Sequence, residues 1–389
     1  MRAKWIVILL LVLAIPAIAI WSYLQRHRHD ELRIGAIFDL TGSLSYMGQW
    51  SLEGAKLAES EINASGGVDG RPIRLIVDDA ETKADRAALV FQRMINVEHL
   101  PVVIGFNGSS EAMACAPIAD RTHVVLFSTG AASPTVTTAG DFVFRNRLSG
   151  AFEASRMAEL ARDPLHLENA AILFINTDYG RGYADAFEQR FRGLGGTIKV
   201  RAGFAQDQTD FRAQLAQIQN TPSIDFVYLA SHVREAASIL RQAADLGLRT
   251  RWLASNAVEA PELFTIAGNA AEGVILTVEA YDPTSTASRT FNAAYKKAYG
   301  RDSEMFAAHA YDAVKLFAQE LGKANGHPEN LRDALYNIKD WPGASGPTTF
   351  DKNGDVIKAV SIKVAQGGRF KAITNEQLVS LFSPSPLKQ

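Results

Sequence analysis

Apolar runs and amphipathic stretches alternate along most of the chain. The runs LRIGAIFDL, IRLIVDD, VVIG and HVVLFS are short and rich in apolar, β-branched residues, which predicts buried strands. Between them, apolar positions recur at helical spacing over residues 48–63, and Val90, Met94 and Val97 share one face of a second predicted helix. Strands that alternate with helices predict a parallel sheet flanked by helices, with right-handed crossovers.

The alternation starts again after the segment FVFRNRLSG. The runs AAILFIN, TIKVRAG, DFVYLA and TRWLAS predict four more strands, followed by GVILTVEAYDP and a last pair, IKAVSIKVA and RFKAI. The sequence therefore predicts an α/β protein with two Rossmann-like lobes, each a parallel sheet flanked by helices. The helices predicted in and after this second unit span residues 151–162, 181–194, 211–219, 234–246, 288–299 and 306–323.

The N-terminus has a different pattern. Arg2 and Lys4 precede the apolar run WIVILLLVLAIPAIAIW, and the charged patch RHRHDE follows. This pattern predicts either a cleaved signal peptide or a membrane anchor over residues 1–24, with residues 5–24 in the inner membrane if they are retained. Either alternative places the rest of the chain outside that membrane, although the basic patch argues weakly against this orientation. No cysteine stands beside the run to carry a lipid.

Length and composition narrow the class further. The chain has 389 residues with 47% hydrophobic composition, enough for two domains. Lys plus Arg (40) nearly balances Asp plus Glu (42), for a net charge of −2, so a nucleic-acid partner is not expected. The single cysteine, Cys115, lies among alanines of a predicted helix and is interpreted as a buried structural residue.

A search for catalytic motifs finds none. The sequence contains no H-E-x-x-H, G-x-S-x-G, P-loop or Rossmann fingerprint. Residues 351–355, DKNGD, resemble a calcium loop only faintly, because the glycine is misplaced and Ile362 stands where the bidentate glutamate belongs. We therefore expect a plain turn there, no metal, no cofactor and no enzyme activity.

Polar side chains instead gather where predicted strands end. In VVIGFNGSSEAM, a strand and a glycine turn lead into a helix with Ser109 or Ser110 as its N-cap. Free N–H groups and hydroxyls at such a junction can seat a carboxylate or phosphate, although capping alone would also explain the serines. Tyr179, His232 and Asn256 follow strands of the second unit, so both sets could face one cleft.

Many segments together resemble one family. They include GAIFDLTGSLSYMGQWSLEGAKLAESEINASGGVDGRPIRLIVDDAET, VVIGFNGSS, FSTGAASPTVT, FVFRN, DYGRGYADAF, TDFRAQL, DFVYLA, RQAADLGL and GPTTFDKNGD. In this order they are similar to the leucine/isoleucine/valine-binding family of type I periplasmic solute-binding proteins. The resemblance implies two lobes that close around a small solute and present it to the permease of an ABC importer in the inner membrane.

The resemblance also implies how the lobes are built. Three crossings would join them, at Arg145–Gly150, Glu279–Asp282 and Gly346–Asp355. Lobe 1 would then comprise residues 32–147 and 281–350, lobe 2 residues 148–280 and 351–375, and the tail residues 376–389.

By the same resemblance, the hydroxyl of Ser109 and the backbone N–H groups near Gly130 and Ala132 would hold the carboxylate of an amino acid. Tyr179 would contact the ligand from the other lobe. Three positions depart from the amino-acid binders: Ala132 replaces a threonine, His232 a tyrosine, and Asn256 the acidic residue that pairs with the ligand's ammonium.

These departures change the expected solute. Without an acidic partner a buried ammonium loses a charge-assisted hydrogen bond worth roughly 1.5–3 kcal/mol, so an ordinary α-amino acid is disfavoured. Asn256 and His232 each offer a donor and an acceptor, which suits an amide, a urea-like group, a hydroxylated acid or a second carboxylate. Aromatic residues that could wall the site, each also explicable as core, are Tyr46, Phe106, Phe152, Tyr179 and Phe306.

The sequence thus predicts an extracytoplasmic, periplasmic solute-binding protein of an ABC importer. One alternative is a membrane-tethered sensor of the same fold that signals to a regulatory partner. An enzyme is a distant alternative.

Overall fold

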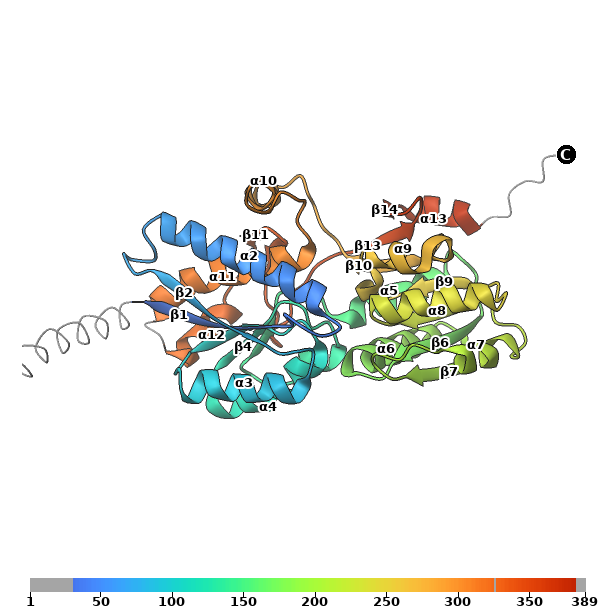
Figure 1. Cartoon of the computed structure of the whole chain (residues 1–389), viewed down its shortest axis with the longest axis horizontal. Coiled ribbons are helices and arrows are strands. Elements are labelled where there is room, and N and C mark those ends of the chain that lie inside the picture. The colour runs from blue at the N-terminus through green and yellow to red at the C-terminus, as the bar shows by residue number, and fades with distance from the viewer. Residues whose placement is uncertain (1–30, 325–326, 383–389) are drawn as a thin grey trace, which may run out of the picture.

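The computed structural model describes residues 31–324 and 327–382. Two sheets, each sandwiched between helices, lie side by side along the long axis of the molecule (Figure 1). We call the part built on β1–β5 lobe 1 and the part built on β6–β10, β13 and β14 lobe 2. This arrangement confirms the predicted α/β class with parallel sheets flanked by helices.

Lobe 1 contains a five-stranded parallel sheet of order β2-β1-β3-β4-β5. Its strands are β1 (Leu32–Phe38), β2 (Ile73–Asp79), β3 (Val102–Gly105), β4 (Val125–Ser128) and β5 (Val143–Arg145). One face packs against α3 (Ala84–Asn96) and α4 (Ser109–Thr122). The other packs against α2 (Ser45–Ala64), α11 (Met305–Ala324) and α12 (Pro328–Tyr336). Smaller elements are η1 (Pro134–Thr138), α10 (Thr286–Tyr299) and the hairpin of β11 (Trp341–Gly343) and β12 (Gly346–Thr348).

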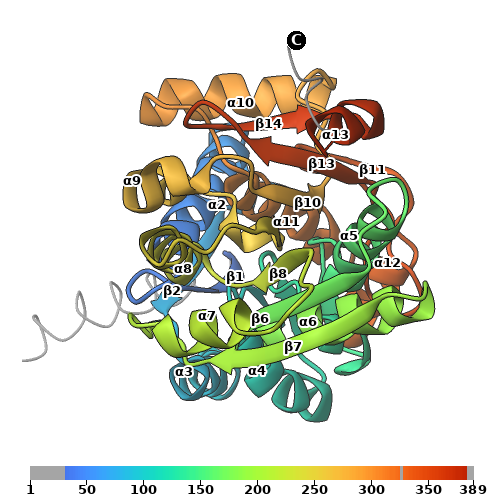
Figure 2. The same cartoon turned by 90° about the vertical axis from the view of Figure 1, so that its right-hand side faces the viewer.

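Lobe 2 contains a seven-stranded sheet of order β14-β13-β10-β9-β8-β6-β7, which Figure 2 shows toward the viewer. Strands β6–β10 are parallel, and β13 and β14 are added antiparallel. The strands are β6 (Asn169–Ile175), β7 (Thr197–Phe204), β8 (Phe226–Ala230), β9 (Arg251–Ala254), β10 (Ile275–Glu279), β13 (Val360–Ala365) and β14 (Phe370–Ile373). The helices are α5 (Gly150–Arg162), α6 (Asp178–Gly193), α7 (Arg212–Gln219), α8 (Val233–Asp245), η2 (Asn256–Val258), α9 (Glu262–Ala267), η3 (Gly268–Ala271) and α13 (Asn375–Phe382).

The two sheets repeat one strand order. The order β7-β6-β8-β9-β10 in lobe 2 matches β2-β1-β3-β4-β5 in lobe 1. In doubly wound sheets of this kind, ligands bind outside the carboxyl ends of the strands, where the order reverses. The loops that leave β1, β3 and β4, and those that leave β6, β8 and β9, are therefore the places to look for a site.

The described residues correct several sequence predictions. The helix predicted with Val97 on its buried face ends one residue earlier, at Asn96, and Val97 is 67% exposed. The predicted tail from residue 376 begins instead as α13, whose Leu378 packs into the core of lobe 2. Cys115 is buried, and burial raises the pKa of its thiol well above the usual value.

The chain passes between the sheets at residues 146–149, 280–285 and 357–359. The third passage lies later than the predicted Gly346–Asp355. Phe350 and Val356 pack in the core of lobe 1. The turn between them is fixed to lobe 1 because Arg145 Nε and Nη2 bind both carboxylate oxygens of Asp355, at 2.6 and 2.8 Å. A buried bidentate pair of this kind holds the turn firmly.

Within residues 31–324 and 327–382, no helix is both long and apolar enough to cross a bilayer. The apolar run of residues 5–24 lies outside the described residues. In the same described part of the chain, no group of three or more His, Cys, Asp or Glu side chains is arranged to hold a metal ion. Residues 351–355 form a turn in which Asp351 Oδ1 accepts from the backbone N–H groups of Asn353 and Asp355.

Candidate functional site

The loop between β3 and α4 brings the first polar group to the cleft. Gly105 has φ of +116°, and a Cβ there would lie 2.0 Å from the carbonyl oxygen of Ile37, so this turn requires glycine. Helix α4 then begins at Ser109 with Gly108 as its N-cap and no side-chain cap, which corrects the predicted capping serine. Ser109 Oγ instead accepts from the backbone N–H of Ser133 at 3.0 Å, so its own hydrogen remains available to donate.

The loop after β4 lies against this serine. Ser128 Oγ accepts from the N–H of Ala131 at 2.9 Å and, at 3.4 Å, from that of Gly130. Among the residues that the structure describes, none accepts a hydrogen bond from the buried N–H of Ala132. A hydroxyl and backbone donors of lobe 1 thus lie together at the carboxyl ends of β3 and β4.

Lobe 2 brings two rings and an amide to the same place. Tyr179, in the first turn of α6, donates from its hydroxyl to Asn256 Oδ1 at 2.8 Å and accepts from the N–H of Ala257 at 3.1 Å. The ring of His232, which precedes α8, lies 5.2 Å from that of Tyr179. Burial lowers the pKa of His232 to about 4, so it is neutral at pH 7. Its Nδ1 is buried and has no hydrogen-bond partner within the described residues.

The lobes touch around these groups. Ser110 Oγ of lobe 1 donates to Asp178 Oδ2 of lobe 2 at 2.8 Å, and Ser133 Oγ donates to the carbonyl oxygen of Asp178 at 2.8 Å. Gln206 Nε2 donates across the cleft to Ser43 Oγ at 3.1 Å. Between the lobes remains a cavity of about 20 Å³, which is roughly the space of one water molecule. Its lining consists of Leu44, Met47, Asn107, Gly108, Ser109, Gly130, Arg147, Tyr179, His232, Asn256, Ala257 and Phe306.

Several predicted site residues share this lining, namely Ser109, Gly130, Tyr179, His232 and Asn256. Whether each of them binds a solute stays a prediction.

Three predicted aromatic walls lie elsewhere. The prediction that Phe106 walls the site is wrong, because its ring lies in the core of lobe 1, 6.0 Å from that of Phe91. The same prediction for Phe152 is also wrong, because this residue is 54% exposed. Tyr46 packs edge-on against Trp50 at 5.6 Å and against the core of lobe 2, outside the cavity lining.

Sequence reasoning missed Arg147, which lies in the first passage between the sheets and lines the cavity. Its Nη1 donates to Glu279 Oε2 at 2.9 Å and its Nη2 to Glu153 Oε1 at 3.2 Å. Asn256 Nδ2 donates to the other oxygen of Glu153 at 2.6 Å, and the Tyr183 hydroxyl also bonds to that oxygen. The available signal was a charged residue two positions after a strand, in FRNRLSG.

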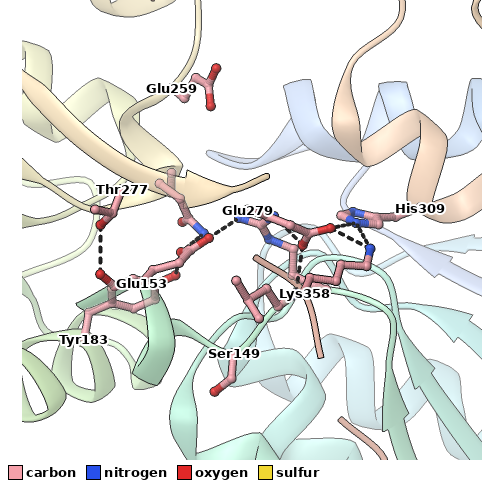
Figure 3. A network of polar contacts seen from close by, with 12 residues as sticks. Ser149, Glu153, Tyr183, Glu259, Thr277, Glu279, His309 and Lys358 are labelled. Carbon is pink, nitrogen blue, oxygen red and sulfur yellow. Dashed lines mark hydrogen bonds and ion pairs between the residues drawn. The ribbon is translucent and has the colours of Figure 1, made fainter. Parts of the chain in front are cut away.

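Glu279 is the centre of this buried network (Figure 3). It accepts from Lys358 Nζ at 2.6 Å, and its Oε1 lies 3.0 Å from His309 Nε2. Burial alone would raise the pKa of Glu279, but Lys358 and His309 hold it well below the usual value. Arg147, Glu279 and Lys358 come from or adjoin the three passages between the sheets, so one charge network joins all three to the cavity.

At Glu153, unlike at Glu279, the effect of burial on the pKa exceeds the combined effect of the neighbouring groups. Burial raises its pKa to about 7 even though the neighbouring Arg147 lowers it.

Asn256 does not face the cavity as a free amide, because its nitrogen is bonded to Glu153 and its oxygen to Tyr179. Each of these two atoms still has one hydrogen-bonding position to spare.

Comparison with known proteins agrees with this geometry. Residues 31–369 match the family model described as periplasmic binding protein. The chain belongs to this family. The resemblance seen in the sequence is thereby confirmed, and membership of the periplasmic binding proteins indicates a periplasmic location.

Relatives of this periplasmic binding protein are themselves named as binding proteins. The leucine-, isoleucine-, valine-, threonine- and alanine-binding protein of Pseudomonas aeruginosa is 26% identical over 333 residues, which cover 84% of this chain and 87% of the relative. The structure of the leucine-binding protein LivK from Thermotoga maritima matches with a TM-score of 0.82 and 29% identity, over 88% of this chain and 98% of that one. LivJ from Streptococcus pneumoniae, in complex with isoleucine, matches with a TM-score of 0.80 and 25% identity, over 88% and 99%.

Proposed function

We propose that this protein is the solute receptor of an ABC importer and that its two lobes close on a small carboxylate, amide or amino-acid-like solute. The observation that carries the proposal is the convergence of polar groups from both lobes on one enclosed cavity. The passages at residues 146–149, 280–285 and 357–359 are the natural hinge, because they are the only covalent links between the lobes within the described chain.

The chemistry of the lining favours particular solutes. The Ser109 hydroxyl and the backbone N–H of Ala132, which has no acceptor among the described residues, supply donors suited to a carboxylate or carbonyl oxygen. No Asp or Glu lines the cavity of about 20 Å³ that we describe, so an α-ammonium placed there would lack a charged partner. His232 and Asn256 can each donate or accept, and they suit an amide, a hydroxyl or a second carboxylate.

Thermal unfolding with a panel of amino acids, amides, diacids and aromatic acids tests the proposal. A solute that binds only the folded chain raises its melting temperature. Replacing Ser109→Ala should weaken the binding of the best solute about tenfold, because a hydrogen bond to a charged group is lost. Ser65→Ala, on the exposed end of α2, is the control and should leave affinity unchanged.

Two outcomes would count against the proposal. If no small solute shifts the melting temperature while a protein partner does, the receptor function is wrong. If affinity is unaltered in Ser109→Ala, this residue is not part of the site.

A sensor of the same fold is a second candidate. It is favoured by the apolar run of residues 5–24, which is long enough to remain as a tether. Mass spectrometry of the mature N-terminus distinguishes the two: an intact Arg2 favours the tethered sensor, and loss of residues 1–24 favours a freely diffusing receptor.

A further inference from the structure

A second cavity, of about 240 Å³, lies between the lobes beside the first. The two cavities share Arg147, Asn256 and Phe306 in their walls, so they adjoin at these three residues. The rest of its lining comes from both lobes: Trp50, Tyr281, Ser303, Glu304, Met305 and Ala308, with Glu259, Val278, Glu279 and Lys363. A solute that reaches past Asn256 and Phe306 would enter this second space.

One wall of this second cavity is aromatic. The rings of Trp50 and Phe306 are nearly parallel, at 14°, with centroids 6.5 Å apart. Tyr281, from the second passage between the sheets, adds a third ring. Its hydroxyl accepts from Asn292 Nδ2 at 2.8 Å, so its own hydrogen is free to donate. Aromatic faces attract cations as well as apolar groups.

Three glutamates line the second cavity, and among the described residues only two of them have a paired cation. Glu259 is paired with Lys363, and Glu279 with Arg147. Glu304, directly before α11, makes no side-chain hydrogen bond or ion pair with any residue that the structure describes. Burial, and then the neighbouring Glu259, raise the pKa of Glu304 to about 7, and the nearby cations Lys363 and Arg301, which lower it, do not offset this rise. Figure 3 shows Glu259 apart from the network around Glu279.

We propose that this second cavity is a subsite for a protonated amine carried at the far end of the solute, and that Glu304 binds that amine. The inference rests on the proposed function, in which the other end of the solute is held at Ser109. It assigns the solute to a class: compounds with a carboxylate or carbonyl group at one end and a remote amine at the other, such as ω-amino acids. An α-amino acid would place its ammonium beside Asn256 instead.

The two polar ends of such a solute would lie in different cavities. The lobe 1 donors at Ser109 suit an anion, and the lining of that first cavity contains no carboxylate. Glu304 supplies the missing carboxylate in the second cavity, with Trp50 and Phe306 as an aromatic flank. A charge-assisted hydrogen bond in such a partly desolvated place is stronger than one in water.

Calorimetry on the full-length chain tests the subsite. The probes are straight-chain ω-amino acids of increasing length, from β-alanine to 6-aminohexanoic acid, the unsubstituted acids of equal length, and the isomeric α-amino acids. We expect one or more of the ω-amino acids to bind roughly tenfold or more tightly than its unsubstituted acid. In Glu304→Gln this advantage should fall to less than about threefold, while binding of the unsubstituted acid is unchanged.

Two further variants keep the result interpretable. Glu304→Asp retains the charge on a shorter side chain and should keep part of the advantage. Glu168→Gln changes an exposed carboxylate directly before β6, at the opposite end of that strand from the cleft, and should keep all of the advantage. Circular dichroism and the melting temperature of each variant confirm that it is folded.

The outcomes separate the two proposals. If unsubstituted acids or α-amino acids bind as well as the ω-amino acids, or if the advantage survives in Glu304→Gln, the amine subsite is wrong and the receptor function stands. If no probe binds but another small solute does, the subsite is also wrong. If no small solute binds at all, the receptor function and the subsite are both wrong.

Discussion

The two lobes share a strand order but offer different chemistry to the cleft. Lobe 1 presents hydrogen-bonding groups close to the backbone, at Ser109 and Gly130, beside apolar side chains such as that of Phe306. Lobe 2 presents its polar groups on the larger side chains of Tyr179, His232 and Asn256. Backbone donors persist whatever side chains the loop carries, but a change of ring or amide alters the other wall at once. We infer that, in this first cavity, the lobe 1 donors hold a group common to many solutes and the polar side chains of lobe 2 distinguish among them.

A second difference concerns buried charge. Each lobe buries a glutamate in the first turn of a helix, Glu111 in α4 and Glu153 in α5, and burial raises the pKa of each to about 7. Glu153 has Arg147 beside it as a counterion. Asp39 is the neighbour of Glu111, and burial and then Glu111 raise its pKa as well. Lobe 2 therefore holds a balanced ionic network, and lobe 1 holds two acids that resist being charged together.

The largest effect is expected from Arg147→Met. The substitution leaves Glu153 without its cation and Glu279 with fewer, and it should lower the free energy of unfolding by about 3–5 kcal/mol. Urea unfolding followed by circular dichroism measures this. Arg212→Met removes an exposed arginine paired with Asp210 and should change stability by less than about 0.5 kcal/mol. If Arg147→Met lowered the free energy of unfolding no more than Arg212→Met does, the network around Glu279 would not depend on Arg147.

Asn256→Asp should have the next largest effect. The new carboxylate would face Glu153 across the present 2.6 Å hydrogen bond, so it should cost about 1–3 kcal/mol at pH 8. The cost should shrink at pH 5.5, because Glu153, with a pKa of about 7, is then protonated and can donate. Urea unfolding at both pH values tests this, with the exposed Asn269→Asp as control. An equal cost at the two pH values would contradict the assigned contact.

Much of the fold could be predicted because it depends on local pattern. Apolar runs located the strands of both sheets except β5, which was not predicted. Strand-end loops pointed to Ser109, Tyr179 and His232, since parallel strands end at one edge. Helix α12 was overlooked although Pro328 at its first turn, with Leu331 and Leu335 four residues apart and buried, is a recognisable signal.

What could not be predicted depends on contacts between distant parts of the chain. Arg147 and Glu279 are 132 residues apart, and no pattern in either segment announces their contact. Phe106 reads as a candidate wall, but its left-handed φ of +56° directs the chain so that the ring enters the core. Three-dimensional packing decides such cases.

The smallest expected effect is on the pH dependence of stability through Glu111. The pKa of Glu111 is about 7 in the folded chain and near its ordinary value of 4.5 when unfolded, so between these pH values the folded state holds more protons. Its contribution to stability therefore falls as pH rises through this window. From pH 5 to 8 the wild type should lose on the order of 1 kcal/mol more stability than Glu111→Gln.

Urea unfolding at half-unit pH steps measures the difference. His232 and His309, whose pKa values burial lowers to about 4, act in the opposite sense, because stability rises with pH where only the unfolded state is protonated. They are present in both chains and cancel in the comparison. The exposed Glu168→Gln should retain the slope of the wild type. If Glu111→Gln also retains the slope of the wild type, the proton that the folded state holds between Asp39 and Glu111 is on Asp39. The contrast between the two buried glutamates would then be wrong.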